Sequence, residues 1–231
     1  AWSGGLEHRG QNPRRNCGVH HCANCAGQEL SCGGARGDRI VLRQSVTAQP
    51  TVIVLAAGKG ERFKASGGSQ DKLQSLLCGL PVRAHVLAAV RASGLPFHVV
   101  ERAHTKHLMN PGMGDSIACG VAATADANGW LILPADLPLI QARTLLAVAT
   151  ALAHHAVVVP RYAGQQGHPV GFAAVCREGL LQLTDDQGAR AVMAQHEACR
   201  LDVDDEGCVW DVDTVDLLQQ VETRMQKSRL D

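Results

Sequence analysis

The sequence predicts an α/β protein built on a mostly parallel central sheet. One observation is the run Thr51–Ala56, a continuous stretch of apolar and β-branched residues that ends at Gly58, as expected for a strand buried on both faces. The other is that similar runs alternate along the chain with stretches of helical apolar period. Because strands separated by helices pair through right-handed crossovers, this order favours parallel pairing.

The remaining elements are expected in order along the chain. The stretch 81–93 predicts a helix, because Val82, Val86 and Val90 fall on one face and Gly94 follows as a stop. The further strands are expected at residues 97–100, 130–133, 156–159, 169–173 and 209–210. The further helices are expected at residues 115–127, 141–154, 180–195 with a polar interruption at 185–188, and from residue 215 onward.

The chain divides near Pro50. Its 231 residues suffice for one sizeable α/β domain, which we place at residues 50–231, with a short appendage. Residues 1–49 are rich in Gly, Arg, Asn and Gln and show neither the helical nor the strand period. We therefore expect these residues to be a leader that is disordered or not native to the chain.

Four cysteines in this leader leave an alternative open. Thiolates at this spacing, together with two neighbouring histidines, suit zinc or an iron–sulfur cluster. A metal site in the leader is therefore the alternative to a disordered segment. The four are Cys17, Cys22, Cys25 and Cys32.

Charge and hydropathy exclude several classes of partner. The 22 basic and 22 acidic residues give a formal net charge of zero, so no overall field attracts a nucleic-acid backbone or an anionic membrane. No apolar run approaches the roughly 20 residues that span a bilayer. We therefore expect a cytoplasmic protein whose partners are small molecules, with any anionic ligand held by a local basic site.

Glycines and basic residues follow the first predicted strand, in the motif Leu55-Ala56-Ala57-Gly58-Lys59-Gly60-Glu61-Arg62. Glycines let the backbone approach a ligand closely, and the N–H groups of such a loop bind phosphate oxygens. Arg62 and the more distant Lys72 would supply the positive charge that a triphosphate requires. The motif is not a Walker A loop, because no Gly-Lys-Ser/Thr ends it. The alternative is an ordinary turn between a strand and a helix.

Acidic residues follow two further predicted strands. Asp136 comes after the strand at 130–133, and Asp213 comes after the one at 209–210. Ligands of parallel sheets bind at the carboxyl ends of the strands, so both carboxylates are candidates for one Mg²⁺ site. The alternatives are a turn aspartate for Asp136 and a helix cap for Asp213.

Three further motifs contain groups suited to a substrate. Gly112, Gly114 and Ser116 lie at the start of a predicted helix, where they could approach a base or a ribose, and a capped loop is the alternative. His168 stands beside a proline at a strand start, and nothing around it marks it as a catalytic base. The segment 185–190 adds polar groups near a helix.

Seven motifs occur together and in a fixed order. They are Leu55-Ala56-Ala57-Gly58-x-Gly60-x-Arg62, Asp71-Lys72-Leu73, Gly112-Met113-Gly114-Asp115-Ser116, Ala135-Asp136-Leu137-Pro138-Leu139, Gly167-His168-Pro169-Val170, Asp186-Gln187-Gly188-Ala189-Arg190 and Asp211-Val212-Asp213-Thr214. Over residues 51–220 this set resembles the MobA-like nucleotidyltransferase family, and within it the molybdenum cofactor cytidylyltransferases. Independent turns would not produce all seven in sequence, so the set is more specific than any one motif.

The resemblance implies a three-layer Rossmann-like fold and a role for each motif. The implied nucleotide-binding residues are Leu55, Ala56, Ala57, Gly58, Gly60, Arg62, Lys72, Gly112, Gly114 and Ser116. The implied catalytic residues are Arg62, Lys72 and Asp136, and the implied metal ligands are Asp136 and Asp213. The implied substrate-binding residues are His168, Gln187 and Arg190.

The resemblance also implies a reaction. A phosphate of a molybdopterin-type acceptor attacks the α-phosphorus of a nucleoside triphosphate bound with Mg²⁺, and pyrophosphate leaves. The Leu-Ala-Ala-Gly form of the first loop looks like the cytidine-using branch of the family, which favours CTP. One alternative is a nucleotide-binding accessory module without turnover, in transient contact with a molybdoenzyme or its chaperone. The other is a sugar-phosphate or methylerythritol-phosphate nucleotidyltransferase.

The sequence departs from the family pattern in three places. Phe63 and Lys64 stand where the family commonly has Met-Gly, and residues 65–70 lengthen the loop before Lys72. The stretch between Gly94 and Gly112 is shorter than is typical of the cytidylyltransferases. These departures bear on the phosphate geometry, the choice of base and the identity of the acceptor.

Overall fold

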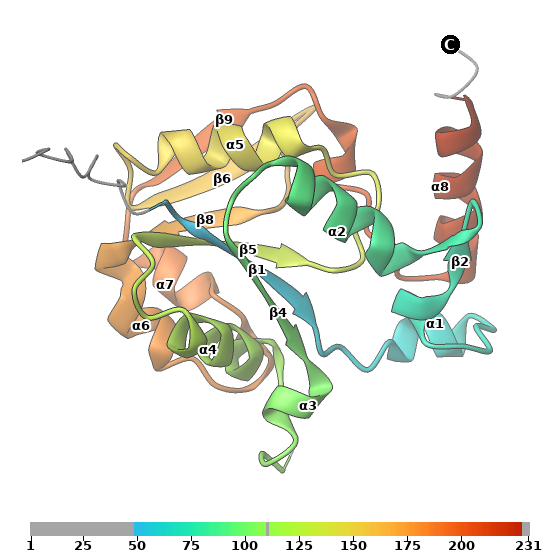
Figure 1. The fold of residues 1–231 in the computed structure, drawn as a ribbon, viewed down its shortest axis with the longest axis horizontal. Helices are drawn as coiled ribbons and strands as arrows, with labels where there is room; N and C mark the ends of the chain where they lie inside the picture. Colours follow the sequence, from blue (N-terminus) through green and yellow to red (C-terminus); the bar gives the residue numbers. More distant parts are fainter. Residues whose placement is uncertain (1–48, 110, 228–231) are drawn as a thin grey trace, which may run out of the picture. The chain divides into compact units, whose positions relative to one another are not determined.

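A computed structural model of the chain describes residues 49–109 and 111–227. The predicted leader, apart from Gln49, lies outside the described residues, and so do its four cysteines. The described part contains a seven-stranded sheet in the order β4-β1-β5-β8-β6-β7, with β9 also paired to β6, and a separate two-stranded hairpin (Figure 1). The strands are β1 Thr51–Ala56, β2 Leu76–Leu77, β3 Leu80–Pro81, β4 Phe97–Glu101, β5 Gly129–Pro134, β6 Val157–Tyr162, β7 Gln165–Gln166, β8 Val170–Ala173 and β9 Ala198–Asp202.

Most strands of the sheet run in one direction, as the sequence predicts. Strand β1 is parallel to β4 and β5, and β6 is parallel to β9. Strand β8 is antiparallel to both of its neighbours, β5 and β6. The reason is the short connection of residues 163–169 between β6 and β8, because a parallel return needs a crossover of a dozen or more residues. The start of β8 therefore lies at the edge where the other strands end.

Helices cover both faces of the sheet. In Figure 1, α2 and α5 lie on one face, and α4, α6 and α7 lie on the other. The helices are α1 Glu61–Ala65, α2 Val82–Ala92, α3 Arg102–Thr105, α4 Met113–Ala123, α5 Ala142–Ala151, α6 Arg177–Leu181, α7 Arg190–Ala194 and α8 Val215–Lys227. Short 3-10 turns are η1 Lys72–Gln74, η2 Ala174–Cys176, η3 Asp185–Gln187 and η4 Glu206–Cys208.

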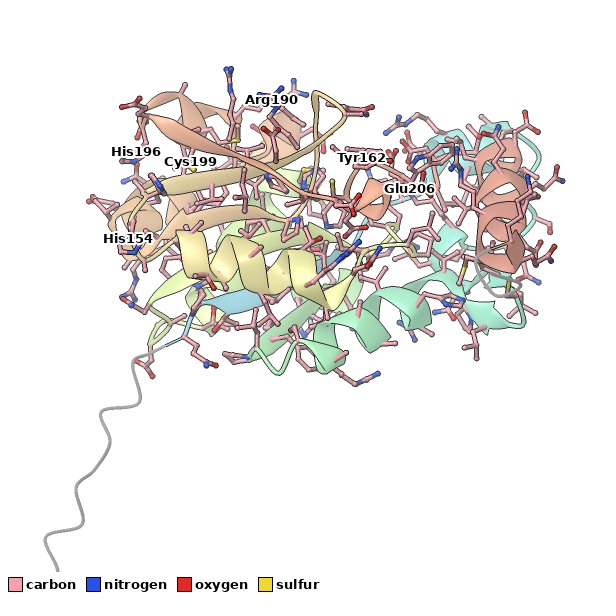
Figure 2. The ribbon with its side chains drawn as sticks, turned by 90° about the horizontal axis from the view of Figure 1, so that it is seen from above. His154, Tyr162, Arg190, His196, Cys199 and Glu206 are labelled. Carbon is pink, nitrogen blue, oxygen red and sulfur yellow. The ribbon has the colours of Figure 1, made fainter. Side chains whose placement is uncertain are left out.

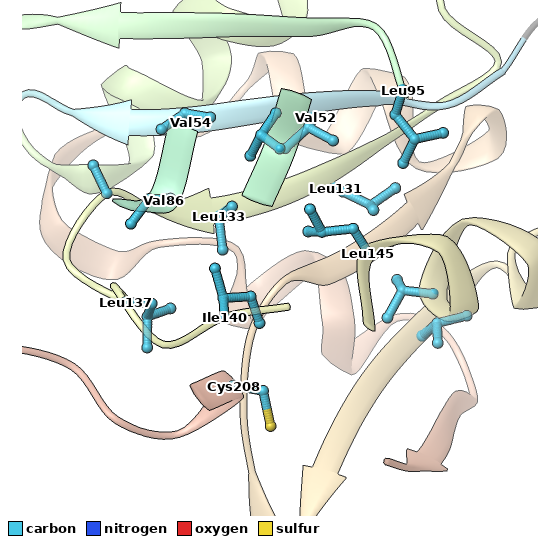
Figure 3. Packing of buried hydrophobic residues seen from close by; sticks show 14 of the residues in the cluster. Val52, Val54, Val86, Leu95, Leu131, Leu133, Leu137, Ile140, Leu145 and Cys208 are labelled. Carbon is cyan, nitrogen blue, oxygen red and sulfur yellow. The ribbon is translucent and has the colours of Figure 1, made fainter. Parts of the chain in front are cut away.

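The alternation of side chains along the central strands fills two cores. Val52 and Val54 of β1 face α2 and α5, where they pack with Leu131, Leu133 and Leu145 (Figure 3). The intervening Ile53 points to the opposite face, in a cluster to which α4, α6 and α7 also contribute. This division follows from the two-residue period of a strand, and it explains why β1 reads as an uninterrupted apolar run.

A third, smaller cluster lies outside the two faces of the sheet. It joins α1, the β2–β3 hairpin, the start of α2 and the residues around α8. Its buried members are Phe63, Leu77, Val82, Val212 and Val221. We call these five residues the outer cluster. It anchors the helix that follows the glycine loop to the segment that precedes α8.

Two expected elements differ from the structure, and one strand was not expected. The strand expected at 209–210 is absent from the described residues, where the turn η4 leads into an irregular segment. The last strand is instead β9, which pairs only with β6 and is half-exposed, so its residues lack the apolar run of a central strand. The helix expected at 180–195 is divided into α6, η3 and α7, because Asp185 and Gly188 adopt positive φ angles.

No helix among the described residues is long and apolar enough to cross a membrane.

Candidate active site

The glycine loop and Asp136 lie side by side because β1 and β5 are neighbours. Leu55 and Pro134 are register partners near the ends of these parallel strands. The pairing continues one step further, where the N–H of Ala135 donates to the carbonyl of Leu55 at 3.0 Å. Asp136 is the next residue, so the sheet itself fixes this carboxylate beside the loop that follows β1.

Lys72 reaches the same place from a different element. It is the first residue of η1, whose N-cap Asp71 accepts a hydrogen bond from the N–H of Leu73 at 3.0 Å. The ammonium Nζ of Lys72 lies 2.6 Å from Oδ2 of Asp136 and 2.9 Å from Oδ1 of Asp213. The two carboxylates therefore converge on a single cation, and their oxygens can be no farther apart than the sum of these two distances.

Asp213 is held in the cluster by its backbone and by a second cation. The N–H of the preceding Val212 donates to the carbonyl of Asp136 at 2.9 Å, which joins the two acidic segments directly. Nη1 of Arg62 lies 2.6 Å from Oδ2 of Asp213, although the Arg62 side chain is 78% exposed. Asp213 does not follow a strand, contrary to the prediction from the sequence, because it lies between η4 and α8.

Burial and charge shift the pKa values in this cluster. Burial lowers the pKa of Lys72, but Asp136 and then Asp213 outweigh it, so the net shift is upward and the ammonium stays charged. Burial raises the pKa of Asp213, but hydrogen bonding and attraction from Lys72 outweigh it and the net shift is downward. The neighbouring Asp211 has a raised pKa because of burial and the negative charge of Asp213.

The two carboxylates fit a divalent cation. Oδ1 of Asp136 is buried and has no hydrogen-bond partner, which leaves a negatively charged acceptor unsatisfied beside the convergent pair. Within the described ranges, no group of three or more His, Cys, Asp or Glu side chains is arranged to hold a metal ion. Mg²⁺ at phosphate-transfer sites commonly takes only one or two carboxylates, with water and substrate phosphates as its other ligands. Asp136 and Asp213 match that donor set.

A pocket of about 390 Å³ opens over this cluster. Most of the glycine loop lines one side of it, from Ala57 to Arg62, together with Lys72, Asp136 and Asp213. Gly60 adopts a left-handed φ of 63° as the residue before α1, a conformation that favours glycine. The loop backbone thus surrounds one open volume together with Arg62, Lys72, Asp136 and Asp213, as binding of a triphosphate with its metal requires.

The start of α4 forms the opposite side of the pocket. Pro111, Gly112, Met113 and Ser116 line it there. A Cβ on Gly112 would lie 2.2 Å from the carbonyl carbon of Asp185, so this glycine is required by close backbone packing. Gly114 is buried against the loop before η3 in the same way and does not line the pocket. The glycine spacing of this motif therefore has a packing cause in addition to any contact with a nucleotide.

Besides Gly114, three described residues of the expected site do not line this pocket. Ala56 instead lines a hollow beneath α2. Arg190, which Figure 2 labels, lines a separate hollow together with His196. His168 lies near Asp136, whose charge partly offsets the lowering of the His168 pKa by burial, and its Nδ1 has no hydrogen-bond partner. The side chain of Gln187, which the sequence also predicts at the site, lies outside the part of the chain that the structure describes.

The pocket also contains residues that the sequence argument did not single out. Glu61 lies inside the glycine-loop motif, Met113 lies between the two glycines of α4, and Asp186 lies in the turn packed against them. Each of these three residues lies within a motif identified from the sequence, so its position in that motif was an indication that it lies at the site. Residue type alone gave no reason to choose them.

Comparisons with known proteins indicate the family to which the chain belongs. The profile of the MobA-like NTP transferase domain matches residues 52–199. The bifunctional protein GlmU of Halorhodospira halophila is 29% identical over 169 residues, which cover 65% of this chain and 32% of that protein. The chain thus spans about a third of the length of this curated relative.

Solved structures show the same fold. Rv0371c from Mycobacterium tuberculosis H37Rv matches with a TM-score of 0.61 and 24% identity, over 76% of this chain and 98% of that chain. The same mycobacterial protein is also known as a complex with manganese, which matches with a TM-score of 0.59, 24% identity and the same coverage. The molybdopterin-guanine dinucleotide biosynthesis protein A from Archaeoglobus fulgidus matches with a TM-score of 0.55 and 16% identity, over 77% and 99% of the two chains.

The profile match covers more than half of the chain and contains the glycine loop, Lys72 and Asp136, and the sheet with its flanking helices is that of solved nucleotidyltransferases. The chain therefore belongs to the MobA-like nucleotidyltransferase family.

Proposed function

We propose that the protein transfers the nucleoside monophosphate of CTP to a phosphorylated, pterin-type acceptor and releases pyrophosphate, with Mg²⁺ as the metal. The observation that carries the proposal is the convergence of Asp136, Asp213 and Lys72 beside the glycine loop. This arrangement supplies what in-line phosphoryl chemistry needs, namely fixed positions and neutralised charge. Rv0371c, which has the same fold, is known as a complex with manganese, and this supports the use of a divalent metal.

Each residue of the cluster has a distinct part in this scheme. The loop from Ala57 to Arg62 would bind the triphosphate through its backbone, and the exposed Arg62 would exchange its contact with Asp213 for an outer phosphate. Lys72 would exchange a carboxylate for a phosphate oxygen, because its ammonium already lies at the wall of the pocket. Asp136 and Asp213 would hold the metal, which when bound supplies charge stabilisation to the phosphates.

No strong base is needed at this site. The attacking group is an acceptor phosphate that is already ionised at neutral pH, so no proton has to be removed before the attack. The described pocket lining accordingly contains acidic, basic and glycine residues, with neither histidine nor cysteine among them. His168, which lies near Asp136 and has an unpartnered ring nitrogen, is the group we assign to the acceptor side.

Pyrophosphate release tests the proposal directly. The full chain is incubated with Mg²⁺, with each of CTP, GTP, ATP and UTP, and with molybdopterin cofactor, a methylerythritol phosphate or a hexose 1-phosphate. We expect release with CTP and the pterin acceptor. Release with another acceptor would replace the pterin assignment, and nucleotide binding without release from any pair would favour the accessory-module alternative.

The Asp136→Asn variant tests the role of the cluster in the same assay. Asparagine keeps the shape of the side chain but removes its negative charge, so we expect turnover to fall by about two orders of magnitude or more. The matched control is Asp202→Asn, a mainly exposed aspartate of β9 that does not line the pocket. Near-normal turnover in the Asp136 variant would remove this residue from the chemistry.

A further inference from the structure

Arg102 contacts both the glycine loop and the turn that carries Lys72, which come from separate segments of the chain. It is the first residue of α3 and directly follows β4, at the edge where the parallel strands end. Its Nη2 donates to the carbonyl of Gly58 at 2.5 Å and also lies 2.9 Å from Oδ2 of Asp71. One guanidinium nitrogen therefore joins the glycine loop to the turn that carries Lys72.

Asp71 links this contact to the backbone turn that carries Lys72. Its second oxygen, Oδ1, accepts from the N–H of Leu73, and its carbonyl accepts from the N–H groups of Gln74 at 2.9 Å and Ser75 at 3.0 Å. These bonds define the turn η1, in which Lys72 is the residue next to the cap. The position of Asp71 thus determines where the Lys72 side chain leaves the backbone.

The loop at Gly58 has little packing of its own. A Cβ built on Gly58 would meet no atom within 4 Å, and the residue is exposed. Its carbonyl is held by the Arg102 guanidinium instead. A hydrogen bond, rather than contact with a core, therefore fixes the loop at this point, so removing that bond should increase the motion of the loop.

We propose that Arg102 is a positioning residue for the nucleotide, which sets the spacing between the glycine loop and the turn of Lys72. This inference rests on the proposed function. The Arg102 and Asp71 side chains are 50% and 36% exposed, and an ion pair of that exposure adds little to global stability. The contribution of Arg102 therefore lies in ordering the empty site, which lowers the entropy lost when a triphosphate binds.

The first experiment compares Arg102→Ala with Arg83→Ala in the full chain. Arg83 is a matched control, because it forms a surface pair of similar exposure with Glu101, 38% and 51%, and does not contact the glycine loop in the described hydrogen bonds. Without nucleotide, we expect amide hydrogen exchange to rise about tenfold at residues 58–62 and 72–75 in the Arg102 variant only. Unchanged exchange at either segment overturns the proposal.

The second experiment measures binding and turnover. We expect the Kd and the KM for CTP with Mg²⁺ to rise about tenfold in Arg102→Ala, with kcat changed by less than about threefold and the Tm by no more than about 2 °C. Asp71→Asn keeps an acceptor for Leu73 but loses the charge that pairs with Arg102, so the double variant should be no weaker than Arg102→Ala alone. Additive losses, or faster exchange with unchanged CTP affinity, would contradict the inference.

The two experiments separate this inference from the proposed function. If the wild-type chain binds no nucleoside triphosphate, the proposed function fails and the role of Arg102 in nucleotide binding fails with it. If the wild type binds CTP and Arg102→Ala binds it equally well, only the role of Arg102 fails. The exchange measurement needs no nucleotide, so it tests the link between the two segments in either case.

Discussion

Replacing Lys72 with methionine should destabilise the fold and make its stability depend on divalent metal. Methionine keeps most of the length and the apolar stem of lysine but removes the ammonium. Asp136 and Asp213, with side chains only 16% and 12% exposed, would then face each other with one cation fewer between them. The exposed Arg62 would remain on the outer oxygen of Asp213.

The size of the loss follows from the geometry. Two unit charges about 4 Å apart interact by about 4 kcal/mol at an effective dielectric constant near 20, and removing one partner of a buried pair typically costs about 3 to 5 kcal/mol. Burial of the ammonium opposes this attraction in the wild type, so we expect a net loss of about 3 kcal/mol in the free energy of unfolding. For a domain of this size that corresponds to a fall in Tm of about 6 to 12 °C.

Thermal melts with and without MnCl₂ or MgCl₂ provide the assay. A divalent ion that binds between the carboxylates stabilises the folded state by mass action, and Lys72 no longer competes for that place in the variant. The metal should therefore raise the Tm of Lys72→Met more than that of the wild type. Lys64→Met, which changes an exposed lysine of α1, is the control. A variant as stable as the wild type and insensitive to metal would refute the reasoning.

Three further predictions concern single residues. Asp211 has a pKa raised by burial and by neighbouring negative charge, so its ionisation costs the folded state stability at neutral pH. Asp211→Asn should therefore raise the free energy of unfolding at pH 7, and this gain should vanish below about pH 4. Urea titrations at both pH values measure the difference. Buried Asp205 accepts three hydrogen bonds, so Asp205→Ala should cost about 3 to 5 kcal/mol in urea unfolding, and a cost below about 1 kcal/mol would contradict this. Gly112→Ala places a Cβ 2.2 Å from the backbone of Asp185 and should cost about 2 kcal/mol by thermal melt, while Gly58→Ala, which meets no atom within 4 Å, should cost much less.

The central part of the fold could be predicted from the sequence because its strands have strong apolar patterns. The predicted run Thr51–Ala56 matches β1 at both ends, and β5 and β8 lie where apolar runs indicated them. Strand β9 was missed because it lies at the edge of the sheet, where half-exposed positions produce no apolar run. The short helix α1 and the β2–β3 hairpin were missed because their pattern is shorter than a reliable period.

The candidate site could be predicted from the sequence only in part. That Asp136 follows a parallel strand predicted its place at the carboxyl edge of the sheet, and the structure places it at that edge beside Lys72. Asp213 reaches the same point by a backbone hydrogen bond between Val212 and Asp136, a long-range contact that no local pattern encodes. Arg102 directly follows β4, so the same rule of residues after strands points to it, but a single arginine after a strand has no pattern that distinguishes it from a surface charge.

The positions of two charged residues in the pocket depend on the outer cluster, which is a very small core. Phe63 and Val212 belong to it, and each is the sequence neighbour of a charged residue in the pocket, Arg62 and Asp213 respectively. Val221 of α8 completes this packing without lining the pocket. A methyl group lost from that distant helix would therefore disturb the spacing of cation and carboxylate while the layers of the sheet remain intact. Heating should then abolish turnover before it melts the secondary structure, because a small packing unit opens at a lower free energy than the whole fold.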